Sequence, residues 1–231
     1  MRMTDQINAQ LASFLDSMEK DLPEQLAELE KQAIQDEVPI IRRQSQSLLR
    51  FIIRTHQPQK VLEVGTAVGF SSLFMLEYGS RTMQITTIEK VPQRILEAKK
   101  NFKNFCSQER IHLCEGDAQN ILEELEKEHK EYDMVFMDAA KGQYMRYLTP
   151  ILSMMKPGAI LVTDNVLLEG TILRSKYAVT RRDRTIHERM REYLYCLTHT
   201  KGLETVIIPM GDGMAVTYVL EDFGGKHGTT D

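Results

Sequence analysis

The stretch Val61-Leu-Glu-Val-Gly-Thr-Ala-Val-Gly-Phe-Ser-Ser72 determines how the rest of the chain is arranged. It begins as a short apolar run, passes through Gly65 and Gly69, and ends where a helical pattern starts. A buried strand that turns at glycines into a helix is expected to bring unpaired backbone N–H groups to one point. Such a point suits an anionic or nucleotide-like ligand, although the same glycine spacing also occurs in turns that only need tight packing.

The composition is that of one globular domain. The chain has 231 residues, 42% of them hydrophobic, which is enough for a single well-formed core. Its formal net charge of −4 excludes an overall basic field for nucleic acid, but not a local basic patch. Three widely spaced cysteines (Cys106, Cys114 and Cys196) lack zinc-site spacing and fit reduced thiols. With no secretory leader and no apolar run that could span a membrane, the sequence predicts a cytoplasmic protein.

From residue 60 onward, strand-like and helical patterns alternate. Strands are expected at 60–64, 84–88, 110–114, 132–137 and 159–163, and helices at about 70–78, 92–105, 118–129 and 142–155. This alternation is typical of βαβ units in a doubly wound, mostly parallel sheet. The chain ends with strand patterns at 203–209 and 214–220 around an Asp-Gly turn, which predicts an antiparallel hairpin and a seven-stranded α/β sheet.

The first 58 residues predict additional helices. Apolar positions mark one helix over 4–19, with Thr4 as its N-cap, a second after Pro23, and a third over about 40–54 that Pro58 ends. We expect these helices to cover the core or a second subunit, which favours a homodimer. The core domain is then expected over 59–221, followed by a loose tail over 222–231.

Acidic residues mark a ligand site at the strand ends, because ligands of such sheets bind at the carboxyl ends of the strands. Glu63 and Gly65 mark the end of the first strand. Glu89 follows Gly65 by 24 residues, close to the spacing at which a carboxylate accepts both ribose hydroxyls. Asp117, next to Ala118, either faces an adenine amino group or is an ordinary N-cap.

The glycine pattern argues against NAD. A dinucleotide fingerprint needs glycines where this chain has Ala67 and Phe70. A ligand without a pyrophosphate needs fewer bare backbone amides, so the pattern favours S-adenosylmethionine.

A second polar cluster is expected where two neighbouring strands end, at Met137-Asp138-Ala-Ala-Lys141 and Val162-Thr-Asp164-Asn165. Parallel strand ends lie about 5 Å apart, so Asp138 can converge with Asp164 and Asn165. Two carboxylates and an amide oxygen suit Mg²⁺ or a similar ion and do not suit Zn²⁺. The alternative is that these residues are helix caps and an Asx turn.

Five motifs together resemble the cation-dependent O-methyltransferases of the catechol and caffeoyl-CoA type. They are the opening stretch, Thr87-Ile-Glu-Lys90, Gly116-Asp-Ala118, Met137-Asp-Ala-Ala-Lys-Gly-Gln-Tyr144 and Thr163-Asp-Asn-Val166. The resemblance implies a Rossmann-like methyltransferase fold with S-adenosylmethionine as methyl donor. It implies that the donor contacts Ile40, Glu63, Gly65, Ser71, Glu89, Ala118 and Asp138. It also implies that Asp138, Asp164 and Asn165 hold the metal and that Lys141 acts as general base.

Within that family, the chain most resembles the bacterial tRNA 5-hydroxyuridine methyltransferases, through Glu169-Gly-Thr-Ile-Leu-Arg-Ser-Lys176 and Val179-Thr-Arg-Arg-Asp-Arg-Thr-Ile-His-Glu-Arg-Met190. Residues 174–191 carry seven Lys or Arg and two acidic side chains, a local excess of five positive charges that could neutralise phosphates. The residues predicted to contact RNA are Arg174, Lys176, Arg181, Arg182 and Arg184. A solvated helix face or a dimer contact is the alternative, and a catechol-like phenol is the alternative substrate.

Overall fold

A computed structural model describes residues 10–11, 13–181 and 183–224, without the side chain of Lys176. The sheet has seven strands in the order β3-β2-β1-β4-β5-β7-β6. The mutually parallel strands at its centre and one edge are β1 (Lys60–Val64), β2 (Gln84–Glu89), β3 (Ile111–Glu115), β4 (Tyr132–Met137) and β5 (Met155–Thr163). β7 (Met214–Val219) runs antiparallel to both β5 and β6 (Leu203–Ile208). The predicted doubly wound sheet with a C-terminal hairpin is therefore confirmed.

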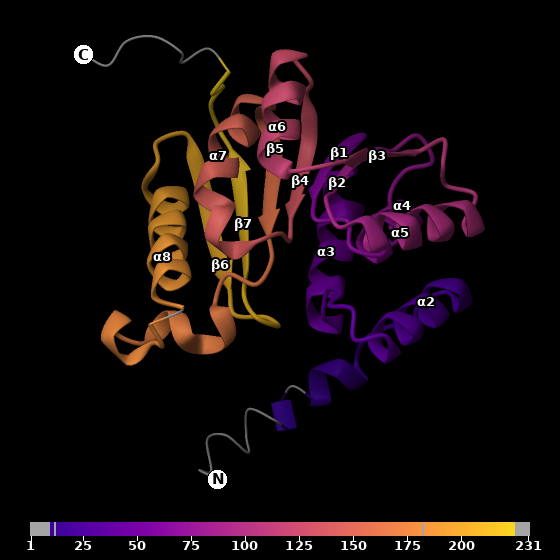
Figure 1. Ribbon diagram of the computed structural model, residues 1–231, viewed down its shortest axis with the longest axis horizontal. Coiled ribbons are helices and arrows are strands. Elements are labelled where there is room, and N and C mark those ends of the chain that lie inside the picture. Colours follow the sequence, from indigo (N-terminus) through magenta and orange to yellow (C-terminus); the bar gives the residue numbers. More distant parts are fainter. Residues whose placement is uncertain (1–9, 12, 182, 225–231) are drawn as a thin grey trace.

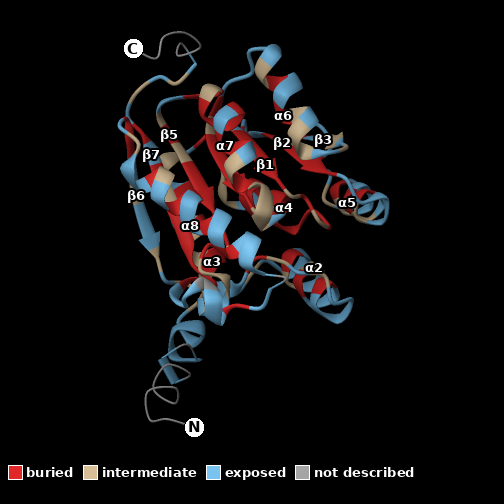
Figure 2. Cartoon of the chain, turned by 60° about the vertical axis from the view of Figure 1, so that its left-hand side comes forward, coloured by how far each residue is buried: buried red, intermediate tan, exposed pale blue. Residues whose placement is uncertain are grey.

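Helices cover both faces of the sheet (Figure 1). One face carries α2 (Glu24–Gln35), α3 (Arg43–His56), α4 (Phe70–Tyr78) and α5 (Pro92–Asn104). The other carries α6 (Ala118–Lys127), α7 (Tyr144–Ser153) and α8 (Arg184–His199). The central strands are almost fully buried, and each helix is buried on its inner side and exposed on its outer side (Figure 2). Short 3₁₀ segments complete the chain: η1 (Lys141–Gln143), η2 (Leu168–Leu173) and η3 (Lys176–Ala178).

The helices after residue 22 belong to the same core as the sheet. Leu26 of α2, and Leu49 and Ile53 of α3, are fully buried against it. α3 ends at His56 because Gln57 adopts a left-handed conformation just before Pro58. Residues 10, 11 and 13–17 are helical, whereas the expected cap Thr4 lies outside the described residues.

Candidate functional site

The carboxyl ends of the central strands surround a cavity of about 550 Å³. It receives residues from the turns after β1, β2, β3, β4 and β5, and from the segment before α3. Most residues predicted from sequence to form the site line it, namely Ile40, Gly65, Ser71, Glu89, Ala118, Asp138, Lys141 and Asn165. The sheet topology thus gathers residues that lie up to 125 positions apart, from Ile40 to Asn165, into one cavity.

Gly65 occupies the tightest position in this cavity. Its φ is +108°, and a Cβ atom there would lie 2.0 Å from the main-chain oxygen of Asp138. Only glycine lets the β1 turn pass so close to the end of β4. The expectation of unpaired N–H groups at this turn is wrong for four of them. The N–H groups of Gly65 and Thr66 donate to the Ile88 carbonyl, that of Gly69 to Thr66, and that of Ala67 to the Glu89 carboxylate.

Glu63 lies beneath the cavity floor and does not line the cavity. Its side chain is fully buried and accepts hydrogen bonds from the hydroxyls of Ser71 (2.5 Å), Ser72 and Thr87 (2.5 Å). Burial raises the pKa of this carboxyl from 4.5 to about 7, even though the three hydroxyls lower it. Glu63 therefore supports the turn that carries Ser71, and the ligand contact implied for its side chain is not seen.

Glu89 is held by its own backbone surroundings. One carboxylate oxygen accepts from the N–H of Ala67, and the other from those of Lys90 and Val91, each at 2.9 Å. A carboxylate has about four acceptor positions, so acceptor capacity remains for a ligand hydroxyl. The side chain is only 7% exposed and lines the cavity, so it meets a ligand in a fixed orientation.

Asp117 is an N-cap, as one of its two sequence interpretations predicts. Its carboxylate accepts from the Gln119 N–H at 3.0 Å at the start of α6, and it lies 3.8 Å from the Lys90 ammonium. The side chain is exposed and does not line the cavity, unlike its neighbour Ala118.

Asp138 and Asp164 follow the paired strands β4 and β5, whose last aligned residues are Met137 and Thr163. The Asn165 amide lies 3.0 Å from the Asp138 carboxylate, and the Ser45 hydroxyl lies 3.4 Å from that of Asp164. Burial raises the pKa of Asp138. It also raises that of Asp164 to about 7, and the charge of Asp138 adds to the shift.

This donor set fits a hard divalent cation. The described residues contain no group of three or more His, Cys, Asp or Glu side chains with metal-site geometry, because the third donor here is an amide. Turning the Asn165 amide by half a rotation would place its oxygen where its nitrogen lies. A cation would then relieve the repulsion between two buried carboxylates.

Lys141 begins η1 and lines the cavity beside the acidic pair. Its ammonium lies 3.4 Å from the carboxylate of Asp212, a residue that sequence reasoning missed. Arg42, Arg94 and Tyr147 also line the cavity and were missed. No motif marks them, because each lies outside the strand ends that the sequence pattern identifies.

The basic segment lies close to Lys141. The Arg189 guanidinium of α8 donates to the carbonyl of Gly142 at 2.8 Å. Arg174, Arg181 and Arg184 are exposed, and Arg184 also donates to the Val179 carbonyl at 3.3 Å. Arg182 and the side chain of Lys176 lie outside the described residues. Part of this positive charge thus stabilises the loop before α8, and Arg174 and Arg181 are presented to solvent.

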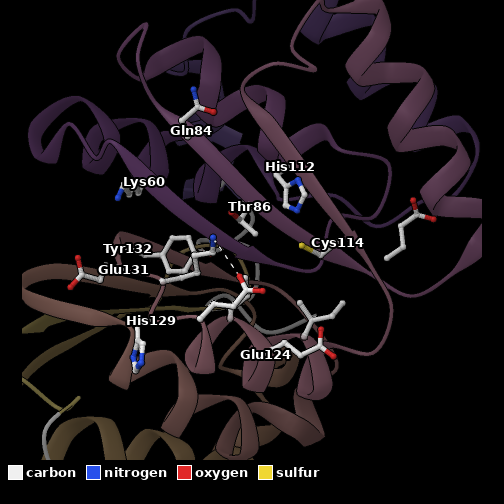
Figure 3. A pocket seen from close by; sticks show the side chains of 14 residues that line it. Lys60, Gln84, Thr86, His112, Cys114, Glu124, His129, Glu131 and Tyr132 are labelled. Carbon is white, nitrogen blue, oxygen red and sulfur yellow. Dashed lines mark ion pairs between the residues drawn. The ribbon is translucent and has the colours of Figure 1, made fainter.

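A larger hollow of about 710 Å³ lies away from these strand ends (Figure 3). Lys60 and Gln84, at the starts of β1 and β2, line it together with His112 and Cys114 of β3. None of the site residues predicted from sequence lies there, so size alone does not identify the site.

No helix within the described ranges is long and apolar enough to cross a bilayer.

Comparisons with known proteins agree with this geometry. A family model described as O-methyltransferase matches residues 16–220. The catechol O-methyltransferase of Niastella koreensis is 30% identical over 126 residues, which cover 54% of this chain and 57% of that protein. That of Mycobacterium tuberculosis is 30% identical over 51% of this chain and 52% of its own length. The chain thus matches little more than half of each of these two relatives. A Podospora anserina methyltransferase, solved with SAH bound, has the same fold, with a TM-score of 0.82, 22% identity, and coverage of 96% of this chain and 98% of its own.

Proposed function

Because the chain belongs to the O-methyltransferase family, we propose that it transfers a methyl group from S-adenosylmethionine to a hydroxyl oxygen, assisted by a divalent cation such as Mg²⁺. The observation that carries this proposal is that one cavity holds both halves of the chemistry. Gly65 and Glu89 lie at the end suited to a nucleoside, and Asp138, Asn165 and Lys141 lie beside them.

The donor is a nucleoside with a ribose diol and a charged amino-acid part. Glu89 has unused acceptor capacity for the ribose hydroxyls, and the missing side chain at Gly65 leaves room against the end of β4. The partly buried carboxylate of Asp138 suits the donor's ammonium group. These residues bind and orient the donor, which is the main task when the transferred methyl is already activated.

Asp138, Asp164 and Asn165 would hold the cation. A bound divalent cation acts as a Lewis acid and lowers the pKa of a hydroxyl that it coordinates. Lys141 lies beside this set as a cation paired with Asp212, where it can stabilise the oxyanion of the substrate. The general-base role remains the alternative for Lys141.

We infer that the acceptor is 5-hydroxyuridine at the wobble position of the tRNA anticodon loop. Its neighbouring carbonyl and hydroxyl oxygens have the spacing that a chelating cation needs. The contact between Arg189 and Gly142 puts the basic segment next to Lys141, and the exposed Arg174 and Arg181 can meet phosphates there. A looped nucleotide is accessible to such a cavity, whereas a base inside a duplex is not. Such a substrate implies a cytoplasmic enzyme.

A small phenolic substrate is the second candidate. It is favoured by the two relatives that are named catechol O-methyltransferases. In that case the basic segment would serve as a lid or a subunit contact.

Transfer of label from S-adenosylmethionine tests both candidates. The protein is incubated with Mg²⁺ and labelled donor, together with either undermodified tRNA or a catechol. We expect label in tRNA, lost with a chelator and in Asp164→Asn, and retained in the control Asp222→Asn, whose exposed carboxylate lies in the C-terminal segment. Label in the catechol alone would reverse the choice of substrate, and full activity of Asp164→Asn with chelator would refute the metal site.

A further inference from the structure

The turn between β6 and β7 places a buried carboxylate in the cavity. Asp212 is 4% exposed and lines the cavity with Asp138 and Lys141. An aspartate that only shapes a hairpin turn can remain in water, whereas a buried carboxylate is costly unless it is paired. The direction of this side chain therefore needs a reason beyond the turn.

Both carboxylate oxygens of Asp212 have a partner. One lies 3.4 Å from the Lys141 ammonium, and the other accepts from the N–H of Glu169. The main chain of the same turn adds two bonds, because the carbonyls of Asp212 and Gly213 accept from the N–H groups of Leu167 (2.8 Å) and Val166 (3.0 Å). The turn thus lies along the whole segment that follows Asn165.

That segment is strained. Asn165, Leu168 and Glu169 have φ values of 61°, 51° and 53°, a left-handed conformation that non-glycine residues rarely adopt. Each such residue costs on the order of 1 kcal/mol and persists only where its surroundings hold it. The bond from the Glu169 N–H to Asp212 supplies part of that hold.

The other side of the turn contacts α3. The Gly211 N–H donates to the Gln44 side chain at 3.1 Å, and a Cβ at Gly211 would lie 2.8 Å from the Ser45 hydroxyl. Ser45 in turn hydrogen-bonds to the Asp164 carboxylate. The turn therefore links α3, the strained segment and Lys141.

We propose that Asp212 is a positioning residue that holds the Lys141 ammonium at a fixed place relative to the oxygens of Asp138, Asp164 and Asn165. It acts through Lys141 on one side and through the Asn165–Glu169 segment on the other. This inference rests on the proposed methyl transfer, in which the oxyanion forms between the lysine and those oxygens.

Two substitutions separate the two contacts. Asp212→Asn keeps an oxygen that can accept from the Glu169 N–H but removes the charge that faces Lys141, whereas Asp212→Ala removes both. We expect Asp212→Asn to lower kcat roughly tenfold or more, the loss typical of one charge-assisted contact, with KM for the donor and Mg²⁺ affinity unchanged. Asp212→Ala is expected to weaken Mg²⁺ binding as well. Asp222→Asn, which also bonds a backbone N–H, is the matched control.

A double-mutant cycle with Lys141→Ala shows whether Asp212 acts through the lysine. In the Lys141→Ala background, Asp212→Asn is expected to change kcat less than about twofold, because coupled residues are not additive. Equal loss in both backgrounds, or kcat of Asp212→Asn equal to that of Asp222→Asn, would overturn the proposal.

Calorimetric Mg²⁺ titration and hydrogen exchange of residues 165–170 need no activity. If the wild-type protein methylates neither tRNA nor a catechol, the proposed function fails, and these measurements still test Asp212. Weaker Mg²⁺ binding and faster exchange in Asp212→Ala, but not in Asp212→Asn, support the positioning role. Identical values in both variants contradict it.

Discussion

The carboxyl group of Glu63 is fully buried under the cavity floor, where three hydroxyls donate to it. Its pKa of about 7 in the folded chain exceeds the ordinary value of 4.5. The folded state therefore holds a proton that the unfolded state releases over this range. Stability is greatest below about pH 4.5 and falls as pH rises toward 7, by on the order of 3 kcal/mol.

Glu63→Gln removes this pH dependence. We expect the free energy of unfolding of the wild-type chain to fall, relative to that of the variant, between pH 5 and about pH 8. Urea denaturation without metal or donor measures the difference. Parallel pH profiles for the two proteins would show that Glu63 titrates normally.

Gly65→Ala tests the close approach of the β1 turn to β4. A Cβ atom there meets the Asp138 carbonyl, and φ is +108°, so we expect a loss of more than about 2 kcal/mol and weaker donor binding. Gly170→Ala is the matched control, because φ is also positive (+76°) but nothing lies within 4 Å. Chemical denaturation and donor titration compare the two, and equal losses would mean that backbone strain alone, and not the contact, makes Gly65 necessary.

Single residues differ in how much the sequence reveals about them. Gly65, Glu89 and Asp138 follow predicted strands, so the topology places them in one cavity. Asp212 could not be found in this way, because an Asp-Gly pair in a hairpin is an ordinary turn signal. Its partner Lys141 lies 71 positions away, and only the folded chain brings them together.

Among the elements, β1 and β4 have the predicted boundaries, since each is a short apolar run with a polar start. β5 begins at Met155 and not at residue 159. Pro157-Gly158 resembles a strand break, but Gly158 adopts a φ of +95° and the pairing with β4 shifts register there, so the strand continues. The helix α8 was recognised only as a basic segment, because its charges obscure the buried stripe of Met190, Tyr193 and Leu197.

The segment around η2 and α8 is where RNA binding can be tested separately from catalysis. We expect Arg174→Ala combined with Arg181→Ala to weaken tRNA binding and to reduce the slope of log K against log[salt] by about 2. Catechol methylation, if present, should not change. Filter binding at several salt concentrations measures the slope, and a wild-type slope in the double variant would assign these arginines another role.

At the scale of the whole molecule, the first helical segment has no cover on its apolar side. Leu11, Phe14 and Met18 are 53%, 58% and 63% exposed in the single chain. We propose that a second copy covers them, and expect a dimer by sedimentation that Phe14→Glu shifts toward monomer. Leu96→Glu, at an exposed position of α5, is the control. A monomeric wild-type chain would contradict this.

The central claim is that the strand-end cavity methylates 5-hydroxyuridine of tRNA with the help of a cation. Nucleoside mass spectrometry of tRNA that carries 5-hydroxyuridine, after incubation with S-adenosylmethionine and Mg²⁺, tests it most directly. We predict 5-methoxyuridine at the wobble position with the wild-type chain and none with Asp164→Asn or with chelator. Absence of the product with active wild-type protein, or its undiminished formation by Asp164→Asn in the presence of chelator, would contradict the claim.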